Sequence, residues 1–477
     1  MKKIGVSVAM LLGVAGAAQA ADLPTSKPAP APPPVLASCA TPNDFFLTNC
    51  PLTYYGITVY GTIDLGAGWQ SHGTKLNPVY PTGIEELVSK NSNHAIWNLV
   101  PGGLSQSNIG IKGKEEFYPG WSFVFDLNMG FDPYTMRVAN GPLSQEMNNG
   151  LPLTMQNSNG DSSRAGQWYN GVGFAGISST TFGTLTFGRQ NSLNLDGVNA
   201  YDPMGGSYAF SPIGYSGATS GIGDTEDARF TTAFKYRVDY GMFRAAALWQ
   251  VGGYDLNNAS NGAYEFQVGG DAPLGNYGKL SLDAVYSHVT DAVSTASLST
   301  AALAAKYPGT LAATISNDDG VMLLAKYTWG PVKVYGGYEH ILFSKPSDPQ
   351  TTFTDIGGFT VFSANITNTA YNANNRVLQV MWTGGRYAFT PDLDAGVAYY
   401  HYIQNNWGGP ASCGAFSSSS SHCAGTMDAV SFDVDWKFFH KFDAYAGLMF
   451  SEMNGGLANG FLQHTNIDPT VGLRFRF

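Results

Sequence analysis

The feature that most limits the possible folds of this chain is a regular alternation of short and long connections between segments of similar length. The short ones are Tyr118-Pro119-Gly120, Ser179-Thr180-Thr181, Tyr240-Gly241, Gly330, Thr390-Pro391 and Phe439-His440-Lys441. The long ones are Gln70–Gln106, Asp132–Gly166, Asn191–Ala228, Asp291–Asp318, Phe343–Asn374, Asn405–Thr426 and Asn454–Asn466. A soluble β-sandwich has no reason to segregate its loops in this way. Short turns at one end and long loops at the other are typical of a transmembrane β-barrel.

The segments between these connections show the period-two hydrophobicity of β-strands. In the last segment, apolar side chains on one face alternate with Arg474 and Arg476 on the other, and the apolar set is Val471, Leu473, Phe475 and Phe477. We count about sixteen such segments, each long enough for a tilted span of roughly 9–11 residues. They are Gly56–Trp69, Ser107–Phe117, Trp121–Phe131, Gln167–Ser178, Phe182–Gln190, Arg229–Asp239, Met242–Gly252, Gly262–Asp271, Gly278–Thr290, Asp319–Trp329, Pro331–Leu342, Asn375–Phe389, Asp392–Gln404, Met427–Phe438, Phe442–Met453 and Ile467–Phe477. Since a sheet of this size must close or leave long exposed edges, we predict an all-β fold, a closed antiparallel transmembrane barrel.

Composition agrees with a wall that has one face in lipid and one in water. Charged residues make up only 13% of the chain, against about 25% in ordinary soluble proteins, and aromatic residues also reach 13%. Composition alone leaves a secreted β-sandwich or β-helix as an alternative. The formal net charge of −10 argues against a nucleic-acid partner, which needs basic surfaces. The same acidic excess favours cations as solutes, an inference that basic residues in the lumen would reverse.

The N-terminus has the layout of a secretory signal peptide. Lys2 and Lys3 precede an apolar stretch, and Ala18-Gln19-Ala20 forms a small-residue cleavage site. A membrane anchor is the alternative, but the apolar stretch is too short to span a bilayer. We therefore predict that residues 1–20 are an export signal. Residues 21–55 then form a spacer, with an extended polyproline-type run at Pro24–Pro34, and a small cysteine loop.

The four cysteines form two local pairs, Cys39 with Cys50 and Cys413 with Cys423. An even number of cysteines in an exported protein favours disulfides. A zinc site is the alternative, although no CxxC motif or nearby histidine pair supports it. We predict both disulfides and no metal.

The chain resembles the general porins of Gram-negative bacteria over roughly Gly56 to Phe477, and its proline-rich spacer, outside that match, is similar to an addition seen in porins of soil-dwelling alphaproteobacteria. The resemblance rests on the order of strands and loops, on the terminal Phe477, on Gly183–Gln190, and on the long third external segment Asn191–Ala228. It implies a sixteen-stranded barrel (residues 56–477) that assembles as a homotrimer in the outer membrane. It also implies a water-filled channel for ions and small hydrophilic solutes, in contact with membrane lipid and lipopolysaccharide.

In that family the third external loop folds inward and narrows the pore, opposite basic side chains of the wall. Here the loop is residues 191–228, and its acidic residues are Asp196, Asp202, Asp224, Glu226 and Asp227. Glycines and prolines in the loop permit a tight fold-back. The alternative is a solvated surface loop whose acidic residues only keep it soluble.

Strand alternation predicts which basic residues face the lumen, because an unpaired base on the lipid face costs roughly 2–4 kcal/mol at mid-depth. Ile109 and Ile111 share one face of their segment, so Lys112 and Lys114 point to the other face. If Phe230, Phe234, Tyr236 and Val238 face lipid, the lumen receives Arg229, Lys235 and Arg237. Arg189 and Arg229 also match arginine positions of the family, whereas Asn108 replaces one. Strict alternation places Arg189 on the outer face, so its lumen position requires a bulge at Gly188 or an end to the regular strand.

The remaining sequence features do not indicate catalysis. Aromatic residues near strand ends suggest interfacial girdles; a sugar-guiding stripe is the alternative, and it would have to face the lumen. No G-x-S-x-G, H-E-x-x-H or P-loop motif occurs, and the eight histidines are scattered. We predict a passive diffusion channel that is not an enzyme and needs no cofactor. A substrate-selective channel, or a barrel adhesin or enzyme, is the alternative.

Overall fold

The computed structural model describes residues 38–72, 94–131, 133–134, 136, 171–213, 229–251, 262–296, 310–347, 354–356, 359–366, 374–407, 423–458 and 463–477. These residues belong to one compact unit, Ser38–Phe477. The predicted signal peptide and the polyproline run lie outside them and stay predictions. Among the described helices, none has the length and apolar character needed to cross a bilayer.

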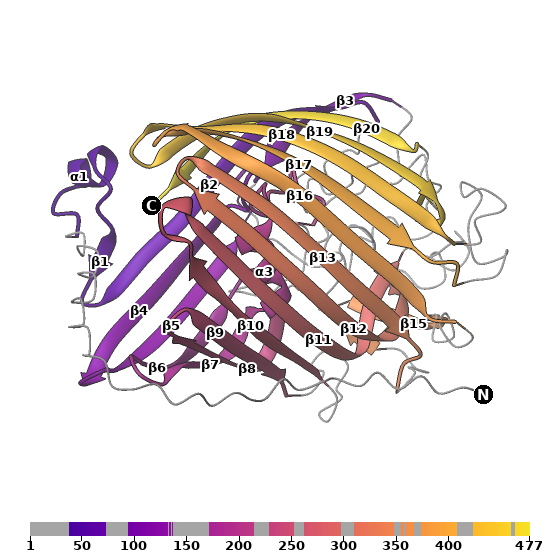
Figure 1. Ribbon diagram of the computed structural model, residues 1–477, viewed down its shortest axis with the longest axis horizontal. Helices are drawn as coiled ribbons and strands as arrows, with labels where there is room; N and C mark the ends of the chain where they lie inside the picture. Colours follow the sequence, from indigo (N-terminus) through magenta and orange to yellow (C-terminus); the bar gives the residue numbers. More distant parts are fainter. Residues whose placement is uncertain are drawn as a thin grey trace, which may run out of the picture. The chain divides into compact units, whose positions relative to one another are not determined.

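The described residues form a closed antiparallel barrel of sixteen strands, which confirms the predicted fold (Figure 1). Its wall consists of β2 (Ile57–Gln70), β4 (Asn108–Tyr118), β5 (Trp121–Gly130), β6 (Gly173–Ser179), β7 (Gly183–Asn191), β8 (Arg229–Tyr240), β9 (Phe243–Gln250), β10 (Ala263–Pro273), β11 (Lys279–Ala296), β12 (Thr310–Trp329), β13 (Val332–Ser344), β16 (Arg376–Thr390), β17 (Leu393–Gln404), β18 (Gly425–Phe439), β19 (Phe442–Gly455) and β20 (Thr465–Arg476). Each strand pairs with the next, and the last pairs with the first, with Asp64 opposite Arg474.

Four further strands lie on this wall. β1 (Leu52–Tyr54) forms a hairpin with β2. β3 (Ile96–Pro101) pairs with the second half of β2, whereas β4 pairs with its first half. β14 (Thr354–Ile356) and β15 (Phe359–Ile366) form a hairpin, and β15 pairs in parallel with the start of β12. β3, β14 and β15 fall within segments expected to be loops, so these connections contain more regular structure than their sequences suggest.

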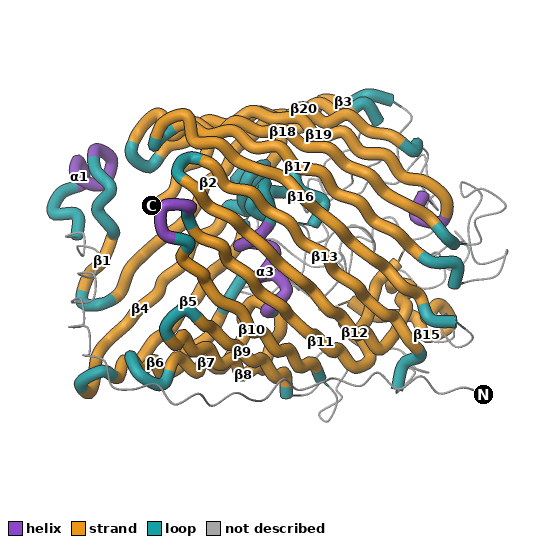
Figure 2. The backbone as a smooth tube through the Cα atoms, viewed as in Figure 1, coloured by secondary structure: helices purple, strands orange, loops and turns teal. Residues whose placement is uncertain are grey.

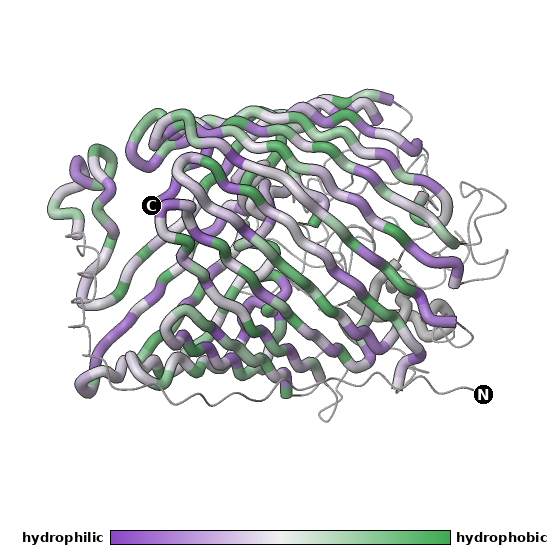
Figure 3. Tube along the Cα trace, in the orientation of Figure 1, coloured by the Kyte–Doolittle hydropathy of each residue, from purple (hydrophilic) through white to green (hydrophobic). Residues whose placement is uncertain are grey.

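The two faces of the wall differ as the alternation predicts. Val471 and Leu473 point outward and remain 53% and 55% exposed in the isolated chain. The side chain of Arg474, between Leu473 and Phe475, points inward and is only 11% exposed. Hydrophobic and hydrophilic residues therefore alternate along each strand (Figure 3). This pattern places the apolar side chains against the membrane and the polar side chains around the lumen.

The connections separate into a short-turn end and a long-loop end (Figure 2). At the short-turn end, β4 and β5 join through Tyr118 and Trp121, which face each other across the turn. The 3₁₀ turn η2 (Gly275–Tyr277) joins β10 and β11 at the same end. A second 3₁₀ turn, η4 (Gly456–Ala458), follows β19 at the long-loop end.

The N-terminal part of the unit forms a small knob around the predicted disulfide Cys39–Cys50, which is present. Its helix α1 (Pro42–Leu47) begins with a capping box, in which Thr41 and Asp44 bond reciprocally. The Phe45 ring lies 5.8 Å from that of Phe477 and 3.9 Å from the ammonium nitrogen of Lys441. The knob therefore packs against the last residue of the chain. Cys413 lies outside the described residues, so the Cys413–Cys423 bond stays a prediction.

Candidate pore constriction

The first half of the third long loop lies inside the barrel. It contains α3 (Leu193–Tyr201) and continues to residue 213. Its side chains Leu193, Val198 and Phe210 are at most 1% exposed and join one apolar cluster with inward-facing wall residues. Those wall residues include Leu248, Leu324 and Trp382. Since apolar side chains of a loop are buried only against a partner surface, this packing holds the loop against the inner wall.

Polar contacts fix the start of α3 to the wall. The Ser192 side chain accepts a hydrogen bond from the Leu195 N–H and caps the helix. The buried Glu265 of β10 accepts a 2.5 Å hydrogen bond from the Leu193 N–H. A carboxylate at this position also complements the positive end of the helix dipole. The Asn194 amide donates to the Ser287 hydroxyl of β11 at 3.1 Å.

The end of α3 is held by contacts to strands on another part of the wall. The Trp382 indole N–H donates to the Tyr201 carbonyl at 3.1 Å, and the Tyr201 hydroxyl contacts Asp283. The Tyr400 hydroxyl donates to the carboxylate of Asp202 at 2.6 Å. Burial raises the pKa of the Asp202 carboxyl above its ordinary value. Asp202, one of the predicted pore acids, is 2% exposed and anchors the loop at the edge of the cavity described below.

Asp196 is the predicted loop acid that meets predicted basic residues. Its carboxylate lies 2.5 Å from the Lys235 ammonium and also contacts the Arg237 guanidinium. The family resemblance predicts acids and bases on opposite sides of the pore. These three residues are adjacent instead, because α3 begins directly after β7 and β7 pairs with β8. The Asp196 carboxylate therefore offsets one of the two positive charges.

The strand β7 contains the bulge considered for Arg189. Its register with β8 shifts between Gly188 and Gln190, and Gly188 has φ of +131°. Arg189 is 9% exposed, not on an open outer face. Thr232 of β8, opposite the bulge, has φ of +51°. The same shift reverses the expected orientation of Phe230, which is 3% exposed and belongs to the interior apolar cluster. The expectation that Phe230 faces lipid was wrong. The prediction by alternation that Arg229 faces the lumen depended on it and loses its basis.

The other predicted residues lie apart from this cluster. The Lys112 ammonium lies 4.8 Å from the centre of the Tyr60 ring, whose hydroxyl donates to Asp126 at 2.5 Å. Lys114 follows two residues later on the same face of β4, nearer the short-turn end. Asp224, Glu226 and Asp227 lie outside the described residues. Their place in the pore stays a prediction.

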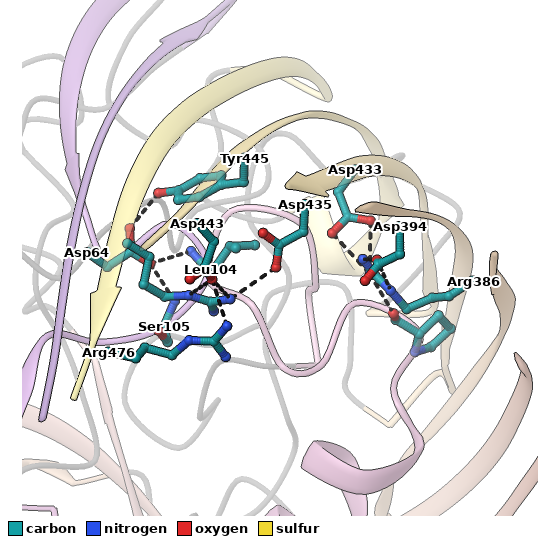
Figure 4. A network of polar contacts seen from close by, with 12 residues as sticks. Asp64, Leu104, Ser105, Arg386, Asp394, Asp433, Asp435, Asp443, Tyr445 and Arg476 are labelled. Carbon is teal, nitrogen blue, oxygen red and sulfur yellow. Dashed lines mark hydrogen bonds and ion pairs between the residues drawn. The ribbon is translucent and has the colours of Figure 1, made fainter. Parts of the chain in front are cut away.

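A cavity of about 360 Å³ lies between the inner loop and the opposite wall. The loop contributes Asn199, Ala200 and Gly205 to its lining. The wall contributes three bases and three acids, from β12, β16, β17, β18 and β20: Lys326, Arg386, Arg474, Asp394, Asp433 and Asp435. Figure 4 shows the acids Asp394, Asp433 and Asp435 with Arg386 beside this stretch of the loop. The cavity is water-accessible and charged, which is the character of a constriction that admits hydrated solutes.

The three bases of this cavity are compensated to different degrees. Arg386 lies 3.0 Å from Asp433, also contacts Asp394, and donates to the Pro203 carbonyl of the loop at 3.1 Å. Arg474 lies 3.1 Å from Asp435 and also contacts Asp443. In contrast, the Lys326 ammonium donates to the Ala200 carbonyl at 2.9 Å and lies 5.1 Å from the Tyr201 ring centre. Within the described residues, no carboxylate lies at ion-pair distance from Lys326.

Lys326, Arg386 and Arg474 are not among the constriction residues predicted from the sequence. Their alternation signal was present, since each lies on the polar face of a predicted strand. Alternation gives the face of a residue but not its height in the pore or its position opposite the loop. Those depend on the register of strands that are far apart in the sequence.

A closed sixteen-stranded barrel with a loop folded into a charged lumen defines a channel protein of a bacterial outer membrane. The family model described as Gram-negative porin matches residues 7–456, and the chain belongs to this family. It is accordingly a protein of the Gram-negative outer membrane.

Known proteins with sequence or fold similarity agree with this assignment. An outer membrane porin protein of Bordetella pertussis is 24% identical over 214 residues, which span 45% of this chain and 40% of the relative. The anion-selective porin from Comamonas acidovorans has a similar fold, with a TM-score of 0.55 and 14% identity over 88% of this chain and 99% of that one. OmpT, an outer membrane protein of Vibrio cholerae, gives a TM-score of 0.52 and 13% identity over 90% and 99%. These structural similarities show the fold.

Proposed function

We propose that this protein is a diffusion porin, a water-filled channel through which ions and small hydrophilic solutes cross the outer membrane down their gradients. The observation that carries the proposal is the charged cavity between the inner loop and the wall of β12–β20. Such a channel needs neither cofactor nor covalent chemistry, and we propose that the protein is not an enzyme. Selection then depends on the width and the charges of the cavity.

We further propose a weak preference for anions. The two arginines of the cavity each contact two carboxylates, so their charges are offset locally. Lys326 forms no ion pair with a described carboxylate, so its charge can attract a passing solute. Lys333 lies on the inward face of the neighbouring strand. A cation in a narrow site with low-dielectric walls attracts anions more strongly than it does in open water. These two lysines oppose the cation preference that the four carboxylates around the arginines and the net charge of −10 suggest.

The protein is proposed to assemble as a homotrimer. Its outer wall around β2, β4 and β20 exposes apolar side chains, among them Leu65 at 39%, Ile109 at 43% and Leu473 at 55%. A Vibrio cholerae OmpT structure with TM-score 0.52 is described as a trimer form. Cross-linking of native membranes followed by mild detergent extraction tests this point.

Recording across a planar lipid bilayer tests the channel itself. Stepwise conductance increases that scale with salt concentration are expected, with a reversal potential under a salt gradient that indicates weak anion preference. Absence of steps from heat-modifiable, correctly folded protein would overturn the proposal. Current block by one sugar or acid at low concentration would instead favour a substrate-selective channel.

A further inference from the structure

The wall strand next to β2 is interrupted near the middle of β2. β3 pairs with β2 as far as Leu65, which lies opposite Pro101, and β4 resumes the pairing at Thr62, opposite Asn108. Two residues of β2 therefore face six residues, 102–107, between β3 and β4. An ordinary β-bulge adds one residue to a strand, whereas this insertion adds four. We call residues 102–107 the inward segment.

The tip of the inward segment is bonded to an inward-facing side chain of β2. The fully buried carboxylate of Asp64 accepts hydrogen bonds from the N–H groups of Leu104 and Ser105 at 3.0 and 2.9 Å. The Tyr445 hydroxyl donates to the other oxygen of the same carboxylate at 2.6 Å. Figure 4 shows Leu104, Ser105 and Tyr445 gathered around this carboxylate. One buried side chain therefore fixes the tip inside the barrel.

The base of the inward segment is bonded to the backbone of the same residue. The Asp64 N–H donates to the Ser107 hydroxyl at 2.9 Å, and the Asp64 carbonyl accepts from the Gly102 N–H at 3.1 Å. At membrane depth, backbone outside a helix or a strand ladder is tolerated only where it is buried in protein or lines a cavity. The inward segment meets this condition, so it is a built part of the lumen.

The inward segment also touches the inner loop. The Ala209 N–H of the loop donates to the Gly103 carbonyl at 2.9 Å. The buried Leu104 side chain belongs to the same apolar cluster as Phe210 of the loop. An added Cβ at Gly103 would lie 2.4 Å from the Tyr445 hydroxyl, so glycine is needed for this close approach. The segment and the loop therefore support each other.

Leu104 lines the constriction cavity. The other lining residues come from the inner loop and from the wall strands, among them Arg474, which is the cross-strand partner of Asp64. Most of the wall residues in this lining are charged. A leucine side chain carries no charge and forms no hydrogen bonds. It therefore acts on a passing solute through the space that it fills.

We propose that the inward segment is a second constricting element of the channel, besides the inner loop, and that Leu104 limits the size of the solutes that pass. Asp64 is a positioning residue, because it is buried and holds Leu104 at the edge of the cavity. The inference rests on the proposed channel function and names the side chain through which the wall of β2 narrows the passage.

Bilayer recordings of the full chain, with entry of neutral sugars of increasing size into vesicles that contain it, test the proposal. Leu104→Ala frees room for about two water molecules, so single-channel conductance should rise roughly 1.2- to 1.5-fold and larger sugars should enter. Leu104→Trp should lower both. Leu378→Ala is the matched control, since Leu378 is also buried in the apolar cluster but does not line the cavity. Its conductance should equal that of the natural protein.

A second pair of variants tests the role of Asp64. Asp64→Asn keeps the size of the side chain but replaces one acceptor oxygen by a donor, so the tip should loosen. We expect larger open-channel current fluctuations and entry of larger sugars. Asp468→Asn removes the same charge from a buried carboxylate of β20 that bonds to Gln70 and Thr470 instead. This control should leave the fluctuations unchanged.

Equal conductance of Leu104→Ala and Leu378→Ala would overturn the role of Leu104, as would the same sugar limit in Leu104→Ala and Leu104→Trp. Equal fluctuations in Asp64→Asn and Asp468→Asn would show that Asp64 does not position the segment. Heat-modified mobility shows whether each variant has folded, and the Leu104 variants leave the bonds of Asp64 in place. Stepwise conductance of the natural protein tests the channel function separately.

Discussion

The carboxylate of Glu265, on β10, accepts a 2.5 Å hydrogen bond from the backbone N–H of Leu193, the first residue of α3. This contact joins the wall to the start of the loop that narrows the channel. Both residues are fully buried, at 0% exposure. The position of the loop, and with it the width of the pore, depends on contacts of this kind.

Replacing Glu265 with alanine should loosen α3. A buried N–H that loses its acceptor costs about 1–3 kcal/mol, and the helix also loses a favourable charge at its N-terminus. We expect a lower thermal unfolding temperature and larger open-channel current fluctuations in bilayer recordings. Glu265→Gln, which keeps an acceptor oxygen, should change both less. Glu115→Ala, at an exposed position of β4, is the control, and a similar effect there would contradict the assignment.

Replacing Asp196 with asparagine should shift ion selectivity toward anions, because Lys235 and Arg237 lose their shared carboxylate. The Lys235 side chain is only 9% exposed, and removing the partner of a buried charge destabilises by about 3–5 kcal/mol. Reversal potentials under a salt gradient and thermal unfolding measure the two effects. The double substitution Asp224→Asn with Asp227→Asn tests the predicted acids outside the described residues, with a shift in the same direction. An unchanged reversal potential would remove those acids from the constriction.

Replacing Lys326 with methionine should shift selectivity toward cations. The variant retains a long apolar side chain over Tyr201 but loses a charge that, among the described residues, has no carboxylate at ion-pair distance. We expect a change in reversal potential and a smaller chloride current. Lys114→Met, also inward-facing but not part of the cavity lining, should have a smaller effect. Equal effects of the two substitutions would mean that ion selectivity depends on the total charge of the lumen and not on the position of the charge in the cavity.

Acid should stabilise the anchor formed by Asp202. Burial raises the pKa of this carboxyl in the folded state above the unfolded value of about 3.9. The neutral form is therefore favoured by folding. The stability that the neutral carboxyl contributes to the folded state is fully present below the unfolded pKa and is lost as pH rises through the folded pKa. Asp202→Asn removes this titration, so the stability of the natural protein relative to the variant should increase as pH falls. A difference that does not change with pH would contradict this account.

Removing the Cys39–Cys50 disulfide should release the knob from the barrel. A cross-link that closes a loop this short contributes about 2–4 kcal/mol by restricting the unfolded segment. In the double variant Cys39→Ser with Cys50→Ser, α1 should become sensitive to protease, and Phe45 should lose its contact with Phe477. The barrel should keep its heat-modified mobility, since its strands pair without the knob. Loss of the folded barrel would show that the knob is needed for closure.

The sequence by itself determined the architecture of this protein, down to individual strands. The predicted segment Phe442–Met453 corresponds to β19 (Phe442–Gly455), and the predicted segment Trp121–Phe131 corresponds to β5 (Trp121–Gly130). Alternation of side chains and the spacing of turns are properties of neighbouring residues, so they can be read along the chain. β3 and β15 were missed because each is a short strand, of six and eight residues, inside a long segment that the alternation of short and long connections assigns to a loop.

Only the tertiary structure decided which charged residues meet in the pore. Arg386 and Arg474 are 88 positions apart in the sequence, yet they line one cavity with Lys326. A bulge at Gly188, opposite the positive φ of Thr232, placed Phe230 inside the barrel against the simple alternation. The height and facing of a side chain depend on the register of every strand up to the closure of β20 on β2. No local pattern contains that information, because one shift in register changes the side-chain positions that follow it.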